Sequence, residues 1–119
     1  MAVCVSIGGV RVVQVGCVEE AEYKFVLSVD RQEYVCWKSY IHFKVLAEAC
    51  MHHTQKHTPT RSMHNTIKTW QRVVNNRPWW SAPVHTLPYL MKESRLLAVF
   101  MKNLLFEVPS LHMLVEFTA

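Results

Sequence analysis

The chain has 119 residues, of which half are hydrophobic and 18% are charged, so it can bury a core and does not have the composition of a disordered tail. No apolar run reaches the roughly 20 residues that a membrane span needs. The four cysteines have wide, irregular spacings and form no Cys-x-x-Cys pair. We therefore expect reduced thiols in a cytoplasmic protein, with Cys36 and Cys4 in the core.

The net charge of +4 is unevenly distributed along the chain. Residues 49–92 contain six Lys or Arg residues and five of the seven histidines, but no Asp or Glu. The segments on either side each have a small negative excess. A segment with charge of one sign is typical of a surface that meets an anion, which could be a membrane, a nucleic acid or an acidic protein. An incidental basic surface is the alternative.

Three strands are predicted in the first third of the chain. Residues 2–16 are rich in β-branched side chains, and Gly8-Gly9 in their middle predicts a kink or bulge. Residues 22–29 alternate between apolar and more polar positions, which indicates a half-buried strand. A polar turn follows, and residues 33–38 form the third strand. Short links between consecutive strands predict an antiparallel meander.

Helical periodicity begins at Tyr40. A first buried stripe, at spacings i, i+3, i+4 and i+7, comprises Phe43, Leu46, Ala47 and Cys50. Residues 62–75 repeat the pattern, with an apolar face of Met63, Ile67, Trp70 and Val74. A basic stripe on another face of this second helix comprises His64, Lys68 and Arg72.

A long, mostly buried helix is predicted over residues 87–108, and a short one over 110–117. The predicted core residues of the long helix are Leu90, Leu97, Phe100, Met101, Leu104 and Leu105. Strands followed by helices predict an α+β domain, in which a three-stranded antiparallel meander packs on a helical subdomain. We expect Phe100 and Leu104 to lie where the first and last helices meet the sheet.

The order of these elements and three local motifs resemble the phox-homology (PX) domain. Lys38-Ser39-Tyr40-Ile41-His42-Phe43, followed by Leu46, is similar to the family's Arg-Arg-Tyr-x-x-Phe junction between strand and helix. Residues 77–83, "RPWWSAP", could be the family's proline-rich, membrane-facing loop. The third motif is a set of apolar residues near the C-terminus: Leu97, Phe100, Met101, Leu104, Leu105, Leu114 and Phe117. The resemblance implies a single PX-like domain over residues 1–119, part of a longer protein.

Members of that family bind phosphoinositide headgroups between sheet and helices, but two positions depart from the pattern. Ser39 stands where the resemblance places the arginine that grips the 3-phosphate. Glu93 stands where it places an arginine that holds inositol hydroxyls, with Arg95 two residues away. Serine cannot replace a guanidinium, and a carboxylate repels phosphate. We expect the corner to be retained as architecture and lost as a phosphate site, with Tyr40 and Lys38 remaining.

The loop around Trp79-Trp80 is the most suggestive binding motif. Two indoles bounded by prolines, with cations nearby, are typical of an interfacial membrane anchor or of a protein-binding hot spot. They could equally fold inward as a lid on the core. Tyr40 likewise could stack on a ligand ring or belong to the core. The predicted site residues are Lys38, Tyr40, Arg72, Arg77, Trp79, Trp80, Lys92 and Arg95.

Cys50, His53 and His57 fall at i, i+3 and i+7, with His52 and His64 nearby, so a metal site was considered. Ligands from one helix face alone are poor zinc geometry, and we expect neither a metal nor another cofactor. We find no nucleophile elbow, no phosphate-cradling glycine loop and no clustered acids, so an enzyme is not expected. The pI near 9 would suit nucleic acid, but no helix has the dense cations of a recognition helix.

These observations predict a non-catalytic binding or scaffolding module whose main partner is a protein. The alternative is atypical binding of a phosphoinositide or anionic membrane through a basic, tryptophan-bearing surface. We expect a cytoplasmic location, and the pattern leaves open a peripheral association with membranes or cytoskeletal structures.

Overall fold

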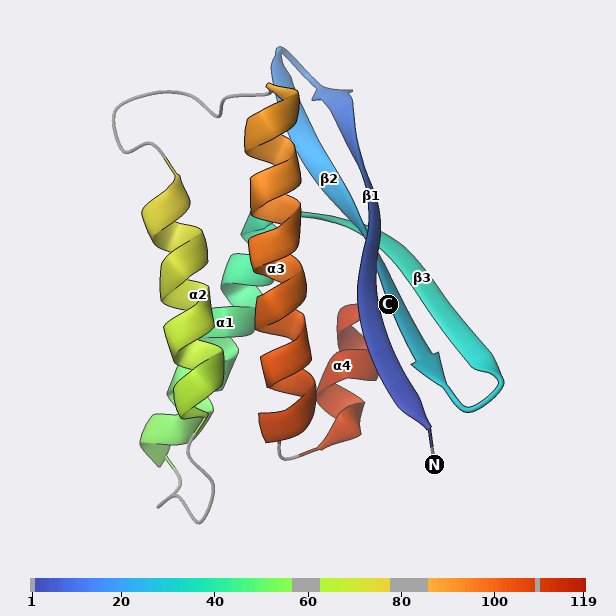
Figure 1. Ribbon diagram of the computed structural model, residues 1–119, viewed down its shortest axis with the longest axis vertical. Helices are drawn as coiled ribbons and strands as arrows, with labels where there is room; N and C mark the ends of the chain where they lie inside the picture. Colours follow the sequence, from blue (N-terminus) through green and yellow to red (C-terminus); the bar gives the residue numbers. More distant parts are fainter. Residues whose placement is uncertain (1, 57–62, 78–85, 109) are drawn as a thin grey trace.

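The computed structural model describes residues 2–56, 63–77, 86–108 and 110–119, with only the backbone at 53–56, and confirms an α+β fold (Figure 1). Three strands come first: β1 (Val3–Val15), β2 (Val18–Val29) and β3 (Gln32–Ser39). Helices follow: α1 (Tyr40–Lys56), α2 (His64–Asn76), α3 (Leu87–Glu107) and α4 (Leu111–Phe117). The sheet is an antiparallel meander of order β1-β2-β3, as predicted.

Two tight turns set the register of the sheet. Gly16 opens the β1–β2 turn with a φ of +62°, which a residue without a Cβ adopts at no steric cost. Asp30, in the β2–β3 turn, has a φ of 54°, and its Oδ1 accepts a hydrogen bond of 2.9 Å from the Ala2 N–H. The pairing of β1 with β2 shifts between Ile7 and Val10, so the bulge predicted at the two glycines is confirmed.

The alternation predicted for the second strand is also confirmed. Tyr23, Phe25 and Leu27 are fully buried, while the intervening side chains are half-buried. The helices cover the buried face: α3 packs against β1, α1 packs against β3, and Phe117 of α4 contacts Phe25 with ring centroids 5.4 Å apart. The core therefore lies between one face of the sheet and the helical layer.

The helix predictions hold except for the buried face of α2. All four residues of the first stripe, from Phe43 to Cys50, are buried in α1. In α2 the buried residues are Thr66, Thr69, Trp70 and Val73, whereas Val74 is 37% exposed and Ile67 is half-buried. The predicted face was rotated because apolarity alone placed it. Buried threonines are tolerated here because their hydroxyls donate hydrogen bonds, Thr66 to Glu107 and Thr69 to backbone carbonyls.

Helix α3 lies between α2 and the sheet (Figure 1). Its predicted core residues Leu90, Leu97, Phe100, Met101 and Leu104 are all buried, and Leu105 is partly buried. At the centre of the α2–α3 contact, the rings of Trp70 and Phe100 lie 5.1 Å apart. Helix α1 and the long helix α3 both pack against the sheet, as predicted, and Phe100 and Leu104 belong to the buried core.

The cysteines only partly match the prediction. Cys4 is exposed, so its assignment to the core was wrong, because it alternates with the buried Val5 on β1. Cys36 is half-buried, Cys17 is exposed and Cys50 is buried. None of the four forms a disulfide, and burial raises the pKa of Cys50 to about 11. A thiol with that pKa stays protonated and unreactive at neutral pH.

Candidate functional site

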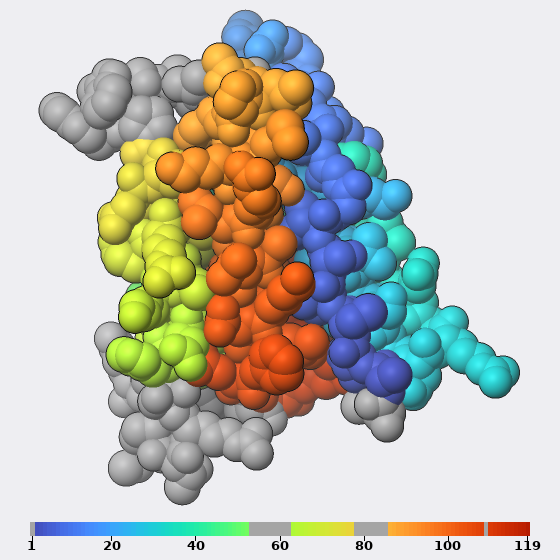
Figure 2. Space-filling model, viewed as in Figure 1, coloured from blue at the N-terminus to red at the C-terminus, as the bar shows by residue number. Residues whose placement is uncertain are grey.

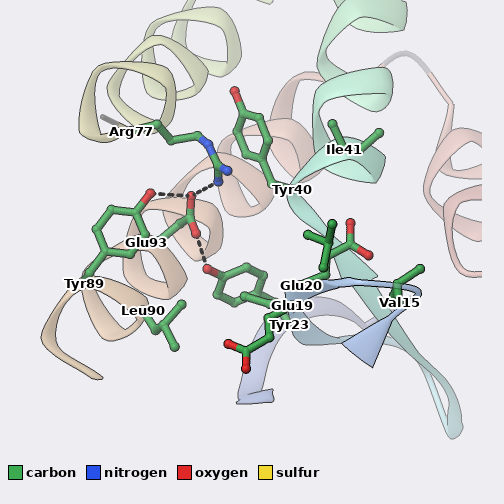
Figure 3. Close-up of a pocket in the computed structure, with 12 residues that line it drawn as sticks. Val15, Glu19, Glu20, Tyr23, Tyr40, Ile41, Arg77, Tyr89, Leu90 and Glu93 are labelled. Carbon is green, nitrogen blue, oxygen red and sulfur yellow. Dashed lines mark hydrogen bonds and ion pairs between the residues drawn. The ribbon is translucent and has the colours of Figure 1, made fainter. Parts of the chain in front are cut away.

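A cavity of about 370 Å³ opens where four segments meet: the β1–β2 turn, the start of α1, the end of α2 and the start of α3 (Figure 3). Its described lining comprises Val15, Val18, Glu19, Glu20, Ala21, Tyr23, Tyr40, Ile41, Arg77, Tyr89, Leu90 and Glu93. These residues come from the end of β1, the first half of β2, the start of α1, the residue after α2 and the first third of α3. A volume of this size suits one or two amino-acid side chains or a small ligand.

Glu93 is the centre of the polar network in the cavity (Figure 3). Its residue is only 1% exposed, and its Oε1 accepts a hydrogen bond of 2.7 Å from Nη1 of Arg77. The Tyr23 hydroxyl donates a short hydrogen bond to Oε2, and the Tyr89 hydroxyl lies 3.4 Å from Oε1. A buried carboxylate is stable only with partners of this kind, and one guanidinium and two tyrosine hydroxyls surround Glu93 inside the fold.

Arg77 also contacts the ring of Tyr40. The guanidinium carbon lies 3.7 Å from the ring centroid, which is a cation–π contact. The same ring stacks on Trp70 of α2, with centroids 5.5 Å apart and planes at 17°. Arg77 and Trp70 thus both contact the Tyr40 ring, which the sequence suggested as a platform for a ligand.

The tyrosines of the cavity act as hydrogen-bond donors. Burial, together with the hydrogen bond to Glu93 and its negative charge, raises the pKa of Tyr23 far above its ordinary value. Burial and the charge of Glu93 raise the pKa of Tyr89 to about 12. Burial also raises the pKa of Tyr40, although the nearby Arg77 opposes the shift. All three hydroxyls therefore remain protonated over the physiological range.

The described lining carries three carboxylates, from Glu19, Glu20 and Glu93, against one guanidinium, from Arg77. The rim of the cavity is apolar. Val15, Val18 and Ile41 line it and are 55%, 61% and 55% exposed. The cavity therefore combines an apolar mouth, a tyrosine wall and an excess of negative charge.

Of the six predicted site residues that the structure describes, two, Tyr40 and Arg77, meet in the cavity. Lys38 points to the C-terminal segment, where its Nζ donates a hydrogen bond of 3.0 Å to the Ala119 carbonyl and lies 5.4 Å from the Phe117 ring. The other described cations of the prediction, Arg72, Lys92 and Arg95, are exposed and do not belong to the lining. These three cations and Lys38 therefore do not share the cavity with Tyr40, and their role in binding a partner stays a prediction.

The two positions that depart from the family pattern are also separated. Glu93 lines the cavity, whereas Ser39 is 2% exposed, lies outside the described lining and has its Oγ 2.9 Å from Nδ1 of His42. The tryptophan pair, Trp79 and Trp80, falls outside the described residues, and so do the prolines that bound it.

The metal alternative gains no ligand set in the part of the chain that the structure describes, where no three His, Cys, Asp or Glu side chains are grouped to hold an ion. Cys50 is buried, with its Sγ 3.9 Å from the sulfur of Met113. His52 and His64 are exposed. The side chains of His53 and His57 lie outside the described residues.

Sequence reasoning missed the tyrosines of the network and two acids of the lining, Glu19 and Glu20. Tyr23 was assigned only to a buried strand face, and Tyr89 was not singled out. One usable signal existed: Glu93 falls at i+3 from Leu90 and i−4 from Leu97, so an acid occupies a core position of α3. A carboxylate at such a position needs a buried partner.

Comparison of the chain with family models, with curated proteins and with solved structures gives no match. The resemblance to phox-homology domains therefore stays a prediction, and the fold class rests on the structure itself. None of the described helices is both long enough and apolar enough to cross a bilayer.

Proposed function

We propose that this protein is a non-catalytic protein-binding module whose cavity receives a side chain of its partner. One observation carries the proposal: Arg77, the one cation in the described lining, is already paired with Glu93. The cavity lies between the sheet and the helices, where the family resemblance implies a phosphoinositide site. Its guanidinium is already bound by the protein's own carboxylate.

The electrostatics of the cavity oppose an anionic ligand. A phosphate needs free guanidinium or ammonium donors, and the Arg77 guanidinium is divided between a carboxylate and a tyrosine ring. Glu19 and Glu20 add further negative charge to the lining. An apolar or positively charged side chain meets no such repulsion.

The mouth of the cavity supports a protein partner. Three exposed apolar residues from three elements, Val15 of β1, Val18 of β2 and Ile41 of α1, line the same cavity. Tyrosine and arginine, which line the interior, are the residue types enriched at the energetic centres of protein interfaces. The raised pKa values of the tyrosines keep them protonated, which supports a role in hydrogen bonding rather than in proton transfer.

Peptide selection against the folded protein tests the proposal. A displayed peptide library is selected on the wild type, and the enriched peptides are measured on Ile41→Asp and Val45→Asp. Both residues are exposed on α1, at 55% and 60%, but only Ile41 lines the cavity. We expect binding to weaken at least tenfold on Ile41→Asp and to be unchanged on Val45→Asp. Selected peptides that bind both variants equally would overturn the proposal.

A titration with the soluble headgroup of phosphatidylinositol 3-phosphate tests the expectation that the cavity does not bind a phosphate ligand. We expect no detectable binding to the wild type. Micromolar affinity, equivalent to about −8 kcal/mol, would contradict the proposal. Glu93→Gln keeps acceptor and shape while releasing the charge of Arg77, so any headgroup binding should appear first in this variant. The substitution of Ser39 by arginine is a poor test, because Ser39 is buried outside the described lining.

A further inference from the structure

The outward face of α3 exposes apolar residues along its whole length. Leu87, Met91, Val99 and Phe106 are 65%, 49%, 41% and 83% exposed. They lie on the side of the helix away from the buried row that includes Leu97. Apolar side chains exposed singly are ordinary, but four on one face of one helix form a continuous feature.

The same face carries cations and no acid. Lys92, Arg95 and Lys102 are all exposed and, at about 100° per residue, fall with the four apolar residues in an arc of about 140°. These seven residues are called the α3 ribbon below. Helix α3 has two acids, and both point elsewhere: Glu93 is buried against Arg77, and Glu107 binds the start of α2.

The surroundings of the α3 ribbon extend its positive charge. Helix α2 packs beside α3, contains no acid and exposes Lys68 and Arg72. The other seven of the nine acidic residues lie outside α2 and α3. Figure 2 shows α3 running down the middle of one face between α2 and β1, without another described segment covering it in that view.

We propose that the α3 ribbon is a docking surface for an anionic lipid bilayer. In a protein interface, charged residues are depleted from the apolar centre, because burying them without partners is costly. Here Lys92, Arg95 and Lys102 lie between the apolar residues at the two ends of the α3 ribbon, so a protein partner that covered the whole ribbon would have to bury them. At a bilayer surface, apolar side chains enter the boundary of the acyl chains while Lys and Arg extend to the phosphates.

The dimensions of α3 fit this mode of binding. A helix of 21 residues is about 32 Å long and can lie flat on a membrane without leaving the fold. Apolar contact comes from both ends, through Leu87 and Met91 at one and Phe106 at the other. Attraction to anionic lipid comes from the three cations between them, each contributing about a factor of five to the partition coefficient. The inference does not depend on the cavity.

Vesicle flotation tests the charge component. The whole chain is mixed with vesicles of phosphatidylcholine alone or with phosphatidylserine added, and we expect binding only when phosphatidylserine is present. Arg95→Glu with Lys102→Glu should reduce binding by at least about 25-fold. The control, Arg31→Glu with Lys44→Glu, makes the same change of total charge at exposed residues of the β2–β3 turn and α1. Equal loss in both variants would show general charge attraction and overturn the proposal.

A second pair of variants tests the apolar component. Phe106→Ser removes the most exposed ring of the α3 ribbon, and Val45→Ser changes a residue on α1 that is 60% exposed. Because both substitutions are at the surface, we expect both variants to fold. Thermal unfolding of the two variants and the wild type checks this. We expect only Phe106→Ser to weaken binding to vesicles containing phosphatidylserine. No binding of the wild type, with capture of an acidic protein through the same residues, would assign the surface to a protein and overturn the proposal.

Ile41→Asp separates this inference from the proposed function. Peptide binding should be lost in that variant while vesicle binding persists, since Ile41 lies outside the α3 ribbon. Loss of both together would mean that one surface serves both ligands and would overturn the assignment to α3.

Discussion

The two acids of α3 hold opposite ends of α2 in different ways. Glu107 is half-buried: its Oε1 accepts hydrogen bonds of 2.6 Å from the N–H and the hydroxyl of Thr66, and its Oε2 accepts one of 3.2 Å from the Asn65 N–H. Glu93 is 1% exposed and pairs with Arg77, the residue that follows the last turn of α2. One acid satisfies backbone donors at a helix start, and the other pairs with a cation inside a cavity.

The two contacts differ in their role. Glu107 stabilises the start of a helix, whereas Glu93 also sets the charge of the cavity. The first turn of α2 has no acid and no side-chain cap of its own, so Glu107 supplies both acceptors and a favourable charge for the helix dipole. Glu93 could be replaced in that anchoring role by an apolar contact. Glu93 instead pairs with Arg77, the one cation of the described lining, and the proposed function rests on this pair.

The apolar centre between these two acids should contribute most to stability. Phe100 is fully buried between Trp70 and the sheet. Phe100→Ala should lower the free energy of unfolding by roughly 3–5 kcal/mol, because it leaves a cavity at the α2–α3 contact. Urea titration followed by fluorescence measures it, with Phe106→Ala as the exposed control on the same helix. A loss under about 1 kcal/mol would mean that the described register of α3 is wrong.

Removal of the cation at the cavity end should come next. Arg77→Ala leaves Glu93 buried with only tyrosine partners, and we expect a loss of about 3 kcal/mol in the free energy of unfolding. Arg72→Ala, at an exposed position of α2, should change stability by less than about 0.5 kcal/mol. Replacing both Arg77 and Glu93 with leucine should recover part of the loss, which chemical unfolding of the three variants would measure. No recovery would show that packing of Arg77 on Tyr40, and not charge, dominates.

Removal of the acid at the other end should have a smaller effect. Glu107→Ala should cost about 1 kcal/mol, because the start of α2 can replace its lost acceptors with water. The control is Glu116→Ala in α4, whose pairing with His112 is exposed and is expected to contribute little. Hydrogen exchange at Asn65 and Thr66 should become faster in Glu107→Ala alone. Equal exchange in both variants would contradict the capping role.

The pH dependence of stability should also reveal the contact between Glu107 and the start of α2. Burial acts to raise the pKa of Glu107, but the hydrogen bonds from Thr66 and Asn65 outweigh it and lower the pKa below its ordinary 4.5. A folded-state pKa below the unfolded one adds stability above pH 4.5, and this is lost as pH falls through the lowered pKa. The stability difference between wild type and Glu107→Gln should thus be constant near neutral pH and shrink in acid. A difference independent of pH would argue against ionised Glu107.

Much of the fold follows from local patterns. The alternation from Tyr23 to Val29 predicted a half-buried strand, the glycine pair predicted the bulge, and the stripe from Phe43 to Cys50 predicted the buried face of α1. These succeed because each side chain's direction is set by the period of its own element. The buried face of α2 failed because Thr66 and Thr69 find hydrogen-bond partners that local periodicity does not reveal.

Of the site, the sequence by itself showed that the middle of the chain is basic and placed Tyr40 and Arg77 among the predicted binding residues, and the family resemblance implied that Glu93 opposes phosphate. Only the tertiary structure decided that Arg77 faces Glu93, that Tyr23 and Tyr89 complete the network, and that Lys38 and the cations of α3 point away from it. The reason is physical. The charge and type of each residue can be read from the sequence, whereas the electrostatic energy of a pair depends on the distance between segments that are far apart in the chain.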